Sequence, residues 1–494
     1  MNNLQYIIFF SFFTAAGVYF WSFLRRLKQD YVSKVLSRSL LENLSGKGAE
    51  IFFCEPVIRQ TASLLGKKKT TKKAFHNLLR GRPKSAEKYL LAHGRELDAL
   101  ILSAHFAPEK AAPRLEKYIK KHPDSQQALC ALAELYFLSG QKDAGRRVLD
   151  CIRLPKAPLY VKGAYWYWQT GFYLKEGDMQ SASQACSQAA KYFIKGRYFY
   201  AAARAYLLMG TIYRVCFVDD VASFMFRGAL DLFRQLKYIP GQAAAYGSLG
   251  MLNAASEHFD EAEAYFRQAE ELFSGENMSG GQAEIINQLG LLNILHGDYA
   301  AAQKHLKAAR AKHKENACLP GLAFNAELFS YWAAAVNDDK ACLRYARKAE
   351  KLYSETGNET AYLESLYLQA EALFRQQQDE KAEEILRRII SYAGTHTTAF
   401  HVANAYSLLG LSFMRRGELS RAKGLFQQSL EQEQKNDRWI GQVCDYANIG
   451  LLELRCGKNE QAQTHLQAAY ELAQALGDTD LAEKIKVNLD KLKS

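Results

Sequence analysis

The chain has 494 residues, a formal net charge of +12 and 48% hydrophobic residues. It holds only nine prolines, none after Pro320, and Ala, Leu, Gln, Glu and Tyr dominate its second half. This length excludes a single small domain, and the composition predicts an all-α chain made of several domains or one solenoid.

The first predicted element is an uncharged run from Leu4 to Leu24 that is rich in Phe and Tyr. About 20 such residues are enough to cross a bilayer. A cleaved signal peptide and a buried core helix are the alternatives, but no basic residue precedes the run and no small-residue cleavage site ends it. Residues 1–25 are therefore predicted to be a retained transmembrane anchor. Arg25, Arg26 and Lys28 follow the run, which predicts an N-terminus outside and the remaining chain in the cytoplasm.

The positive charge lies close to this anchor. Residues 1–90 contain 16 Lys and Arg against five Asp and Glu, so the rest of the chain is nearly neutral. We expect residues 26–66 to be a basic juxtamembrane segment, and the basic residues of 25–90 to attract anionic lipid headgroups. A solvated linker face is the alternative. No nucleic acid is expected as a partner, because no recognition motif accompanies the charge.

Residues 67–157 show degenerate repeats of small and apolar residues. In one of them Ala99 is followed by Ala111 and Leu115, and Ala133 comes 34 residues after Ala99. The sequence thus predicts short repeat units before residue 158.

From residue 158 to residue 476 one pattern returns every 40 residues, eight times and without an insertion. An alanine-rich series follows a small residue by 12 positions, and a large apolar series follows it by 16. A fixed period of this kind indicates a repeat array. The small residues, which we call the small position, are Thr170, Gly210, Gly250, Gly290, Ser330, Ala370, Gly410 and Gly450.

Each repeat is predicted to be a first helix with the small position at its centre, a turn, and a second helix. Gly297-Asp298, Gly417-Glu418 and Gly457-Lys458 mark such turns. The small position should let the two helices approach closely, so a larger residue at Gly250 or Gly290 is expected to cost roughly 1–3 kcal/mol. Because one helix pair cannot bury its own apolar face, the pairs are expected to stack.

The pattern resembles that of the tetratricopeptide repeat family. The family period is about 34 residues, so the 40-residue repeats resemble a long type, as in kinesin light chains, with longer helices and links. The resemblance implies an all-α, right-handed α-solenoid of helix-turn-helix repeats, and residues 477–494 look like its polar capping helix. Asn253 stands where Tyr is expected; the matching residues of one repeat are Tyr246, Leu249, Gly250, Ala262, Phe266 and Ala269.

No motif for chemistry is visible. The nine cysteines contain no C-x-x-C pair, and Cys186 and Cys342 occupy repeat packing positions. The histidines lack metal-ligand spacing, and no phosphate-binding or nucleophile motif occurs. Asp219-Asp220 and Asp338-Asp339 are expected to cap helices. We therefore predict a protein that is not an enzyme and takes no cofactor or metal.

Two functions are compatible with such an array. One is a membrane-tethered scaffold or adaptor for a protein partner, resembling bacterial inner-membrane tetratricopeptide proteins but lacking their C-x-x-C module. The other is a targeting or import receptor, resembling those of the mitochondrial outer membrane. Some such receptors hold client tails with a carboxylate clamp of Lys, Asn and Arg, and at the Asn slot of that clamp only Asn448 of this chain matches. The corresponding locations are a bacterial inner membrane or, alternatively, an organelle outer membrane.

The resemblance places partner binding on the first helices, which line the concave face in this family. The implied slots lie three before, one after and four after the small position. Arg375, Arg415 and Arg455 form an evenly spaced basic ladder beside the last slot, which suits carboxylates of an amphipathic or acidic partner segment. Ordinary inter-helix core is the alternative for the apolar members. The slots hold Tyr167, Leu174, Asn287, Leu291, Ile294, Glu327, Tyr331, Tyr367, Glu371, Phe374, Leu411, Met414, Leu451 and Leu454.

Overall fold

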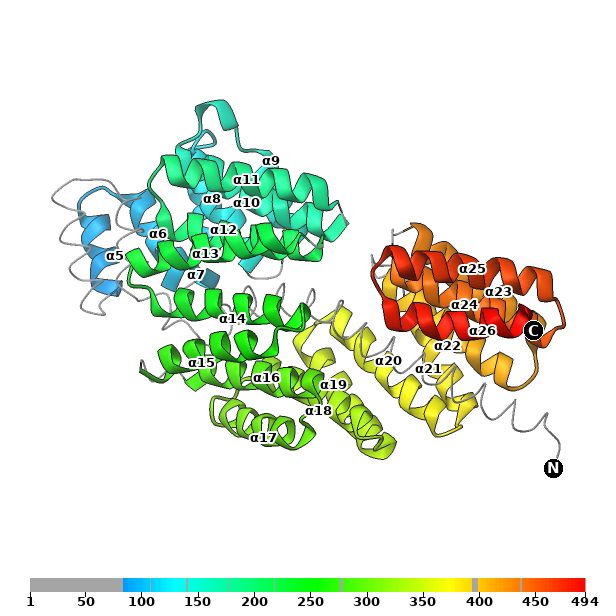
Figure 1. The fold of residues 1–494 in the computed structure, drawn as a ribbon. Helices are drawn as coiled ribbons and strands as arrows, with labels where there is room; N and C mark the ends of the chain where they lie inside the picture. The colour runs from blue at the N-terminus through cyan, green and yellow to red at the C-terminus, as the bar shows by residue number, and fades with distance from the viewer. Residues whose placement is uncertain are drawn as a thin grey trace. The chain divides into compact units, whose positions relative to one another are not determined.

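The computed structural model describes residues 83–106, 108–138, 141–176, 178–216, 218–275, 279–392, 399–435 and 438–493. Within these ranges every regular element is helical, with 22 α-helices and the short 3-10 helix η3 (Leu154–Lys156) (Figure 1). The all-α prediction is confirmed. The predicted anchor and juxtamembrane segment lie outside the described residues. No helix in the described ranges is long and apolar enough to cross a bilayer.

The described helices fall into two compact bodies, one made of residues 83–288 and the other of residues 289–493, so that α16 contributes to both. The helices that begin in the first body are α5 (Pro83–Ala92), α6 (Glu96–Phe106), α7 (Pro108–Lys121), α8 (Gln126–Leu138), α9 (Lys142–Asp150), α10 (Leu159–Glu176), α11 (Met179–Lys195), α12 (Phe199–Val215), α13 (Asp219–Gln235), α14 (Ile239–Ala255), α15 (Phe259–Gly275) and α16 (Ser279–His296). Those of the second body are α17 (Tyr299–Glu315), α18 (Leu319–Ala335), α19 (Asp339–Thr356), α20 (Glu359–Arg375), α21 (Asp379–Tyr392), α22 (Ala399–Arg415), α23 (Leu419–Lys435), α24 (Trp439–Arg455), α25 (Asn459–Ala475) and α26 (Thr479–Lys493).

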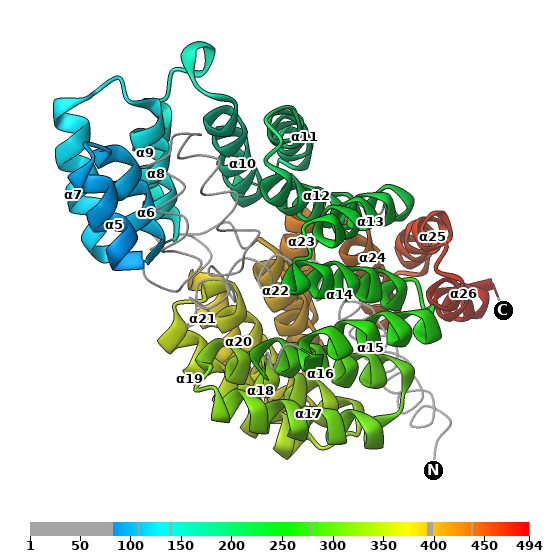
Figure 2. The same ribbon diagram turned by 90° about the vertical axis from the view of Figure 1, so that its left-hand side faces the viewer.

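From α10 to α25 the helices alternate as first and second helices, and each begins 20 residues after the last. Most are 17 residues long and are joined by three-residue links, which together account for the 40-residue period. The residues added to the ordinary repeat length therefore extend the helices. In each body, consecutive helices pack side by side, as Figures 1 and 2 show.

The links share one hydrogen-bonded geometry. Between α13 and α14, Lys237 takes a φ of 52°, and its N–H donates to the carbonyl of Arg234 at 3.0 Å. The N–H of Tyr238 donates to the carbonyl of Phe233 at 2.9 Å. This pair of bonds is a Schellman motif, which ends a helix at a left-handed residue. The predicted turn residues Gly297, Gly417 and Gly457 also have positive φ, so these turns are confirmed.

The aspartate pairs behave differently from one another. Asp338 caps α19, because its carboxylate accepts a hydrogen bond from the N–H of Ala341 at 2.9 Å. The other expected cap is wrong, since Asp219 and Asp220 lie in the first turn of α13 and Val218 holds the N-cap position. Their carboxylates still face the positive end of the helix dipole, which is favourable for a negative charge.

The small position brings the two helices of a repeat together, as predicted. A Cβ atom added to Gly250 would lie 2.8 Å from the ring of Phe266. At Gly290 it would lie 2.7 Å from Leu306, and at Gly410 it would lie 2.6 Å from Phe426. Real Cβ atoms do not approach neighbours so closely. A Cβ atom at these three glycines would therefore force the facing side chain to move. The alanine series is fully buried, as at Ala262 and Ala302.

The first helices also contact one another. In the first body α6 contacts α8, α8 contacts α10, and α12 contacts α14; in the second, α18, α20, α22 and α24 form a continuous row. Each second helix is joined mainly to the first helices before and after it. The first helices therefore form the inner layer of each body, and any surface along this layer combines residues from several repeats.

Candidate functional site

Side chains six positions before the small position bridge successive first helices. In the second body, Tyr331 of α18 donates a hydrogen bond to Glu364 of α20 at 2.9 Å. The other carboxylate oxygen of Glu364 lies 3.5 Å from Nδ1 of His401 on α22. Glu364 is half-buried, whereas Tyr331 and His401 are buried. One half-buried carboxylate is therefore held in place by contacts with the two neighbouring first helices.

The first body has a bridge of opposite charge at the same slot. Arg204 of α12 lies with its guanidinium carbon 5.3 Å from the ring centroid of Tyr167 on α10, and one of its nitrogens is 3.4 Å from the Tyr167 hydroxyl. Tyr160 donates to Glu134 of α8 at 3.3 Å. Burial raises the pKa of Glu134, and Arg204 opposes that rise. A cation and a carboxylate thus share an aromatic setting across α8, α10 and α12.

The residue at the slot six before the small position differs again on α16 and α18. Burial raises the pKa of Glu284 to about 7, although Gln288 donates a hydrogen bond to it at 3.1 Å. Phe324 stands at this slot on α18 and is half-buried. The slot thus presents a cation at Arg204, a carboxyl group at Glu284 and Glu364, and an aromatic ring at Phe324.

Most residues of the sequence-predicted groove lie inside the helix packing. Burial of this kind is what the inter-helix core alternative expects of the apolar members. Their part in binding stays a prediction. The buried members are Tyr167, Asn287, Leu291, Ile294, Glu327, Tyr331, Tyr367, Glu371, Leu411 and Met414. The half-buried members are Leu174, Phe374, Leu451 and Leu454.

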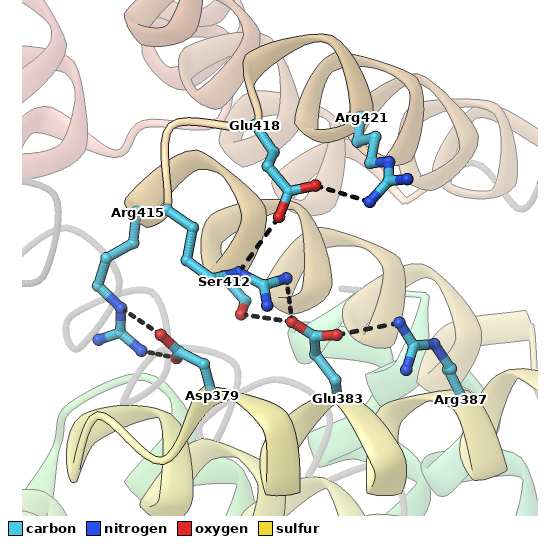
Figure 3. A network of polar contacts seen from close by, with 8 residues as sticks. Asp379, Glu383, Arg387, Ser412, Arg415, Glu418 and Arg421 are labelled. Carbon is cyan, nitrogen blue, oxygen red and sulfur yellow. Dashed lines mark hydrogen bonds and ion pairs between the residues drawn. The ribbon is translucent and has the colours of Figure 1, made fainter.

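The basic ladder makes contacts between successive repeats. Arg375 is paired with Asp339 of the preceding second helix at 2.6 Å. Arg415 is paired in the same way with Asp379, as Figure 3 shows, and it also donates to the carbonyl of Phe374 at 3.0 Å. These two arginines already hold carboxylates of their own chain, which accounts for their even spacing without a partner.

The third member of the ladder has a different neighbour. Arg455 donates to the carbonyl of Met414 at 3.4 Å, and Leu419 occupies the position that Asp339 and Asp379 hold in the two preceding repeats. Arg455 is exposed. A 36-residue spacing between Asp and Arg was visible in the sequence and could have indicated the internal pairs.

The residues that sequence reasoning missed are those six before the small position. They lie three residues ahead of the predicted slot three before the small position, so both slots share one helix face. A signal was present, because this slot holds the charged residues Arg204, Glu284 and Glu364 where a core slot would stay apolar. Its half-buried members are Arg204, Ala244, Glu284, Phe324 and Glu364.

The cysteines differ in their exposure. Cys186 and Cys342 are fully buried in packing positions, as expected, while Cys151, Cys216 and Cys456 are exposed. In the part of the chain that the structure describes, no three His, Cys, Asp or Glu side chains are grouped as a metal site.

Comparison with known proteins extends the family resemblance. Residues 243–274 match the tetratricopeptide repeat. This stretch holds α14 from Ala243 onwards and nearly all of α15, so one repeat of the array carries the family's own pattern. No curated protein matches the chain.

Several solved structures share the helical-repeat arrangement at low identity. Aspartyl phosphate phosphatase F from Bacillus subtilis is 13% identical over 69% of this chain and 94% of its own, with a TM-score of 0.46. Yeast Tom70 is 13% identical over 87% and 96%, with a TM-score of 0.45. The quorum sensor NprR from B. thuringiensis is 13% identical over 74% and 99%, with a TM-score of 0.48. These likenesses are too distant to assign a role.

Proposed function

We propose that this protein is a non-enzymatic scaffold that binds a protein partner along its first helices and is tethered to a membrane by residues 4–24. The repeat match at residues 243–274 supports an interaction role, because helix-pair arrays expose long surfaces built from many repeats. The tether rests on the uncharged run and its basic flank.

The observation that carries the binding proposal is the half-buried slot six before the small position. Arg204, Phe324 and Glu364 present a cation, a ring and a carboxylate edge from rigid helices. Arginine and aromatic side chains dominate binding energy in protein interfaces when neighbours exclude water around them. The buried tyrosines behind Arg204 and Glu364 hold both charges in place, which lowers the entropy cost of binding.

Site-specific crosslinking in cells tests this proposal. A photoreactive residue replaces Phe324 or Glu364 in one pair of variants, and Gln268, which is exposed on the second helix α15, serves as the control position. We expect one or two stoichiometric partners crosslinked from the first two positions and none from the control. Many substoichiometric clients would instead favour the targeting receptor, and equal crosslinking from all three positions would contradict binding along the first helices.

The tether has a separate test. Protease added to sealed cells should leave residues 30–494 intact, because the array is proposed to lie on the cytoplasmic side. Digestion of the array from outside would contradict this orientation. Loss of membrane association should follow deletion of residues 1–28.

A further inference from the structure

The second helices α17 and α19 carry a concentration of positive charge that neither the fold nor the proposed function uses. Together they hold ten Lys and Arg against four Asp and Glu. Three of the cations on α17 are exposed, and so are four on α19. We call these exposed residues the basic face: Lys304, Lys307, Lys314, Lys340, Arg344, Arg347 and Lys351.

The two rows lie close enough to act together. Lys348 of α19 is half-buried beneath the basic face. Burial lowers its pKa, and Arg310 and Lys314 of α17 lower it further. A cation depresses the pKa of another only when the two are near each other. Both helices also pack on α18, the first helix that lies between them in the chain.

Elsewhere in the second body, the chain supplies carboxylates to its cations. On α21 and α23, Arg387 pairs with Glu383 at 2.9 Å and Arg421 pairs with Glu418 at 2.7 Å, as Figure 3 shows. In the described ranges, no carboxylate forms an ion pair with any residue of the basic face. The basic face thus lacks the carboxylate partners that Arg387 and Arg421 have on α21 and α23.

The spacing of the cations follows the helix pitch. On α19 the exposed cations are separated by four, three and four residues, and on α17 Lys304 and Lys307 are three apart with Lys314 seven further on. Such residues lie on one side of a helix, about one turn of 5.4 Å or two turns apart. A partner helix with carboxylates at three- and four-residue spacing would present matching charges.

Other polyanions fit the basic face less well. None of the exposed large apolar side chains of the described residues lies on α17 or α19, so the basic face lacks groups that insert into a bilayer. It also lacks exposed aromatic rings on which unpaired bases stack.

We infer that the basic face of α17 and α19 docks an acidic segment of a protein partner, one that carries Asp or Glu on one side of a helix. This surface lies on the second helices, so it is separate from the first-helix surface proposed above.

The test uses the full chain in detergent and a labelled helical peptide with Glu at alternating three- and four-residue spacing. The patch variant combines Lys304→Glu, Lys307→Glu, Arg344→Glu and Arg347→Glu. The matched control combines Lys191→Glu, Lys195→Glu, Arg227→Glu and Lys237→Glu, which reverses as many exposed cations on α11, α13 and the link after α13. A second patch variant with Gln at the four positions removes charge without introducing repulsion.

We expect the acidic peptide to bind the wild-type chain in a salt-dependent way. The Glu patch variant should bind at least about tenfold more weakly, because each exposed pair contributes up to about 1 kcal/mol. The affinity of the Gln variant should lie between those of the wild-type chain and the Glu variant. The affinity of the control should stay within about threefold of the wild-type value. Circular dichroism verifies helix content in each variant.

Three results would overturn the inference. Equal weakening in the patch variant and the control would mean that only net charge matters. If the wild-type chain does not bind the peptide, the basic face is not a docking surface for an acidic segment. Patch-dependent binding to phosphatidylserine vesicles or duplex DNA, without peptide binding, would assign the basic face to lipid or nucleic acid. A Phe324 or Glu364 variant should leave peptide binding unchanged, which separates this inference from the first-helix proposal.

Discussion

Two series of glycine contacts hold the repeats together, and they differ in chemistry. Within a repeat, Gly210, Gly250 and Gly410 pack on Phe residues 16 positions later, and Gly290 and Gly450 pack on Leu. Between repeats, a glycine near the start of a first helix packs on a residue eight positions earlier. That residue changes along the chain, as the pairs Phe233–Gly241, Phe273–Gly281, His313–Gly321 and Glu433–Gly441 show.

The contact between repeats therefore admits titratable groups where the contact within a repeat does not. His313 is only 2% exposed and Glu433 only 1%. Both lie in the last turn of a second helix, where the chain turns and polar groups find partners more easily than at mid-helix. The small position lies at mid-helix, where a buried polar group would be costly. We therefore expect pH to affect repeat stacking at His313 more than helix pairing at the glycines of the small position.

The largest expected effect comes from breaking the contact within a repeat. Gly250→Leu places a side chain where the Phe266 ring already lies, so we expect a loss of about 3 kcal/mol of local stability. Hydrogen exchange should show the loss in α14 and α15 and far less in α24 and α25, because each repeat touches only its neighbours. Equal loss of protection in every repeat would contradict a nearest-neighbour array. Gly424→Ala is the control, because a Cβ there meets no neighbouring atom.

A pH-dependent effect is expected at the contact between repeats. Burial lowers the pKa of His313 to about 4, whereas an unfolded histidine titrates near about 6.5. Between these values the unfolded chain binds more protons, so stability falls as the pH is lowered through this window. His313→Phe, the residue found at the equivalent Phe233 and Phe273, should remove this loss.

The magnitude of that effect is about 2 kcal/mol between pH of about 7 and about 5. Hydrogen exchange in α17 and α18 of the wild-type chain and the variant at both pH values measures it. The Phe273→His variant is the converse experiment, and it should introduce acid sensitivity at α15 and α16. Parallel pH profiles for wild-type and His313→Phe proteins would show that this histidine does not couple stacking to pH.

Two arginines of the basic ladder, Arg415 and Arg455, allow a comparison of polar contacts between repeats. Arg415→Met keeps the apolar stem but removes the ion pair with Asp379, and we expect a loss of about 1–2 kcal/mol. Arg455→Met should cost less than Arg415→Met, because Leu419 stands at the position from which Asp379 pairs with Arg415. Thermal unfolding of both variants, together with Asp379→Asn and the double variant, measures the coupling. Similar losses at the two arginines would argue against the ion pair as a stacking contact.

The smallest effect concerns the links. Gln377 holds a φ of 59°, which is unfavourable for a residue with a Cβ atom, while Gly417 holds a φ of 82° at the equivalent link of the next repeat. Gln377→Gly should therefore stabilise the chain by about 1 kcal/mol, and Gly417→Ala should destabilise it by a similar amount. Denaturant unfolding of the two variants shows whether each one raises or lowers the free energy of unfolding. A destabilised Gln377→Gly protein would mean that the side chain contributes more than the backbone strain costs.

Much of the fold was predictable because its information is periodic. The small position, its large apolar neighbour such as Phe266, and turn glycines such as Gly417 recur at constant spacing, and they act within one helix pair. Short-range contacts of this kind depend on residues whose separation is set by the helix repeat. The roles of the Asp pairs were less predictable, because a shift of the helix start by one residue decides whether an aspartate is the N-cap or lies in the first turn.

The candidate site was predicted less well, because exposure is a property of neighbouring repeats. Tyr367 and Glu371 have the composition of a binding surface, yet both are buried against adjacent first helices. Arg415 belongs to an even basic series, yet Asp379 from the preceding repeat holds it. Arg204 and Glu364, by contrast, are half-buried.

The sequence by itself determined the all-α class, the 40-residue period and the close approach of the two helices at the small position. These features follow from side-chain size and spacing along one chain segment. The tertiary structure decided which first-helix residues remain accessible, which arginines are paired internally, and that the cations of α17 and α19 lie together. Those outcomes depend on stacking between repeats, where side chains about 40 residues apart in the sequence compete for the same space and the same charges.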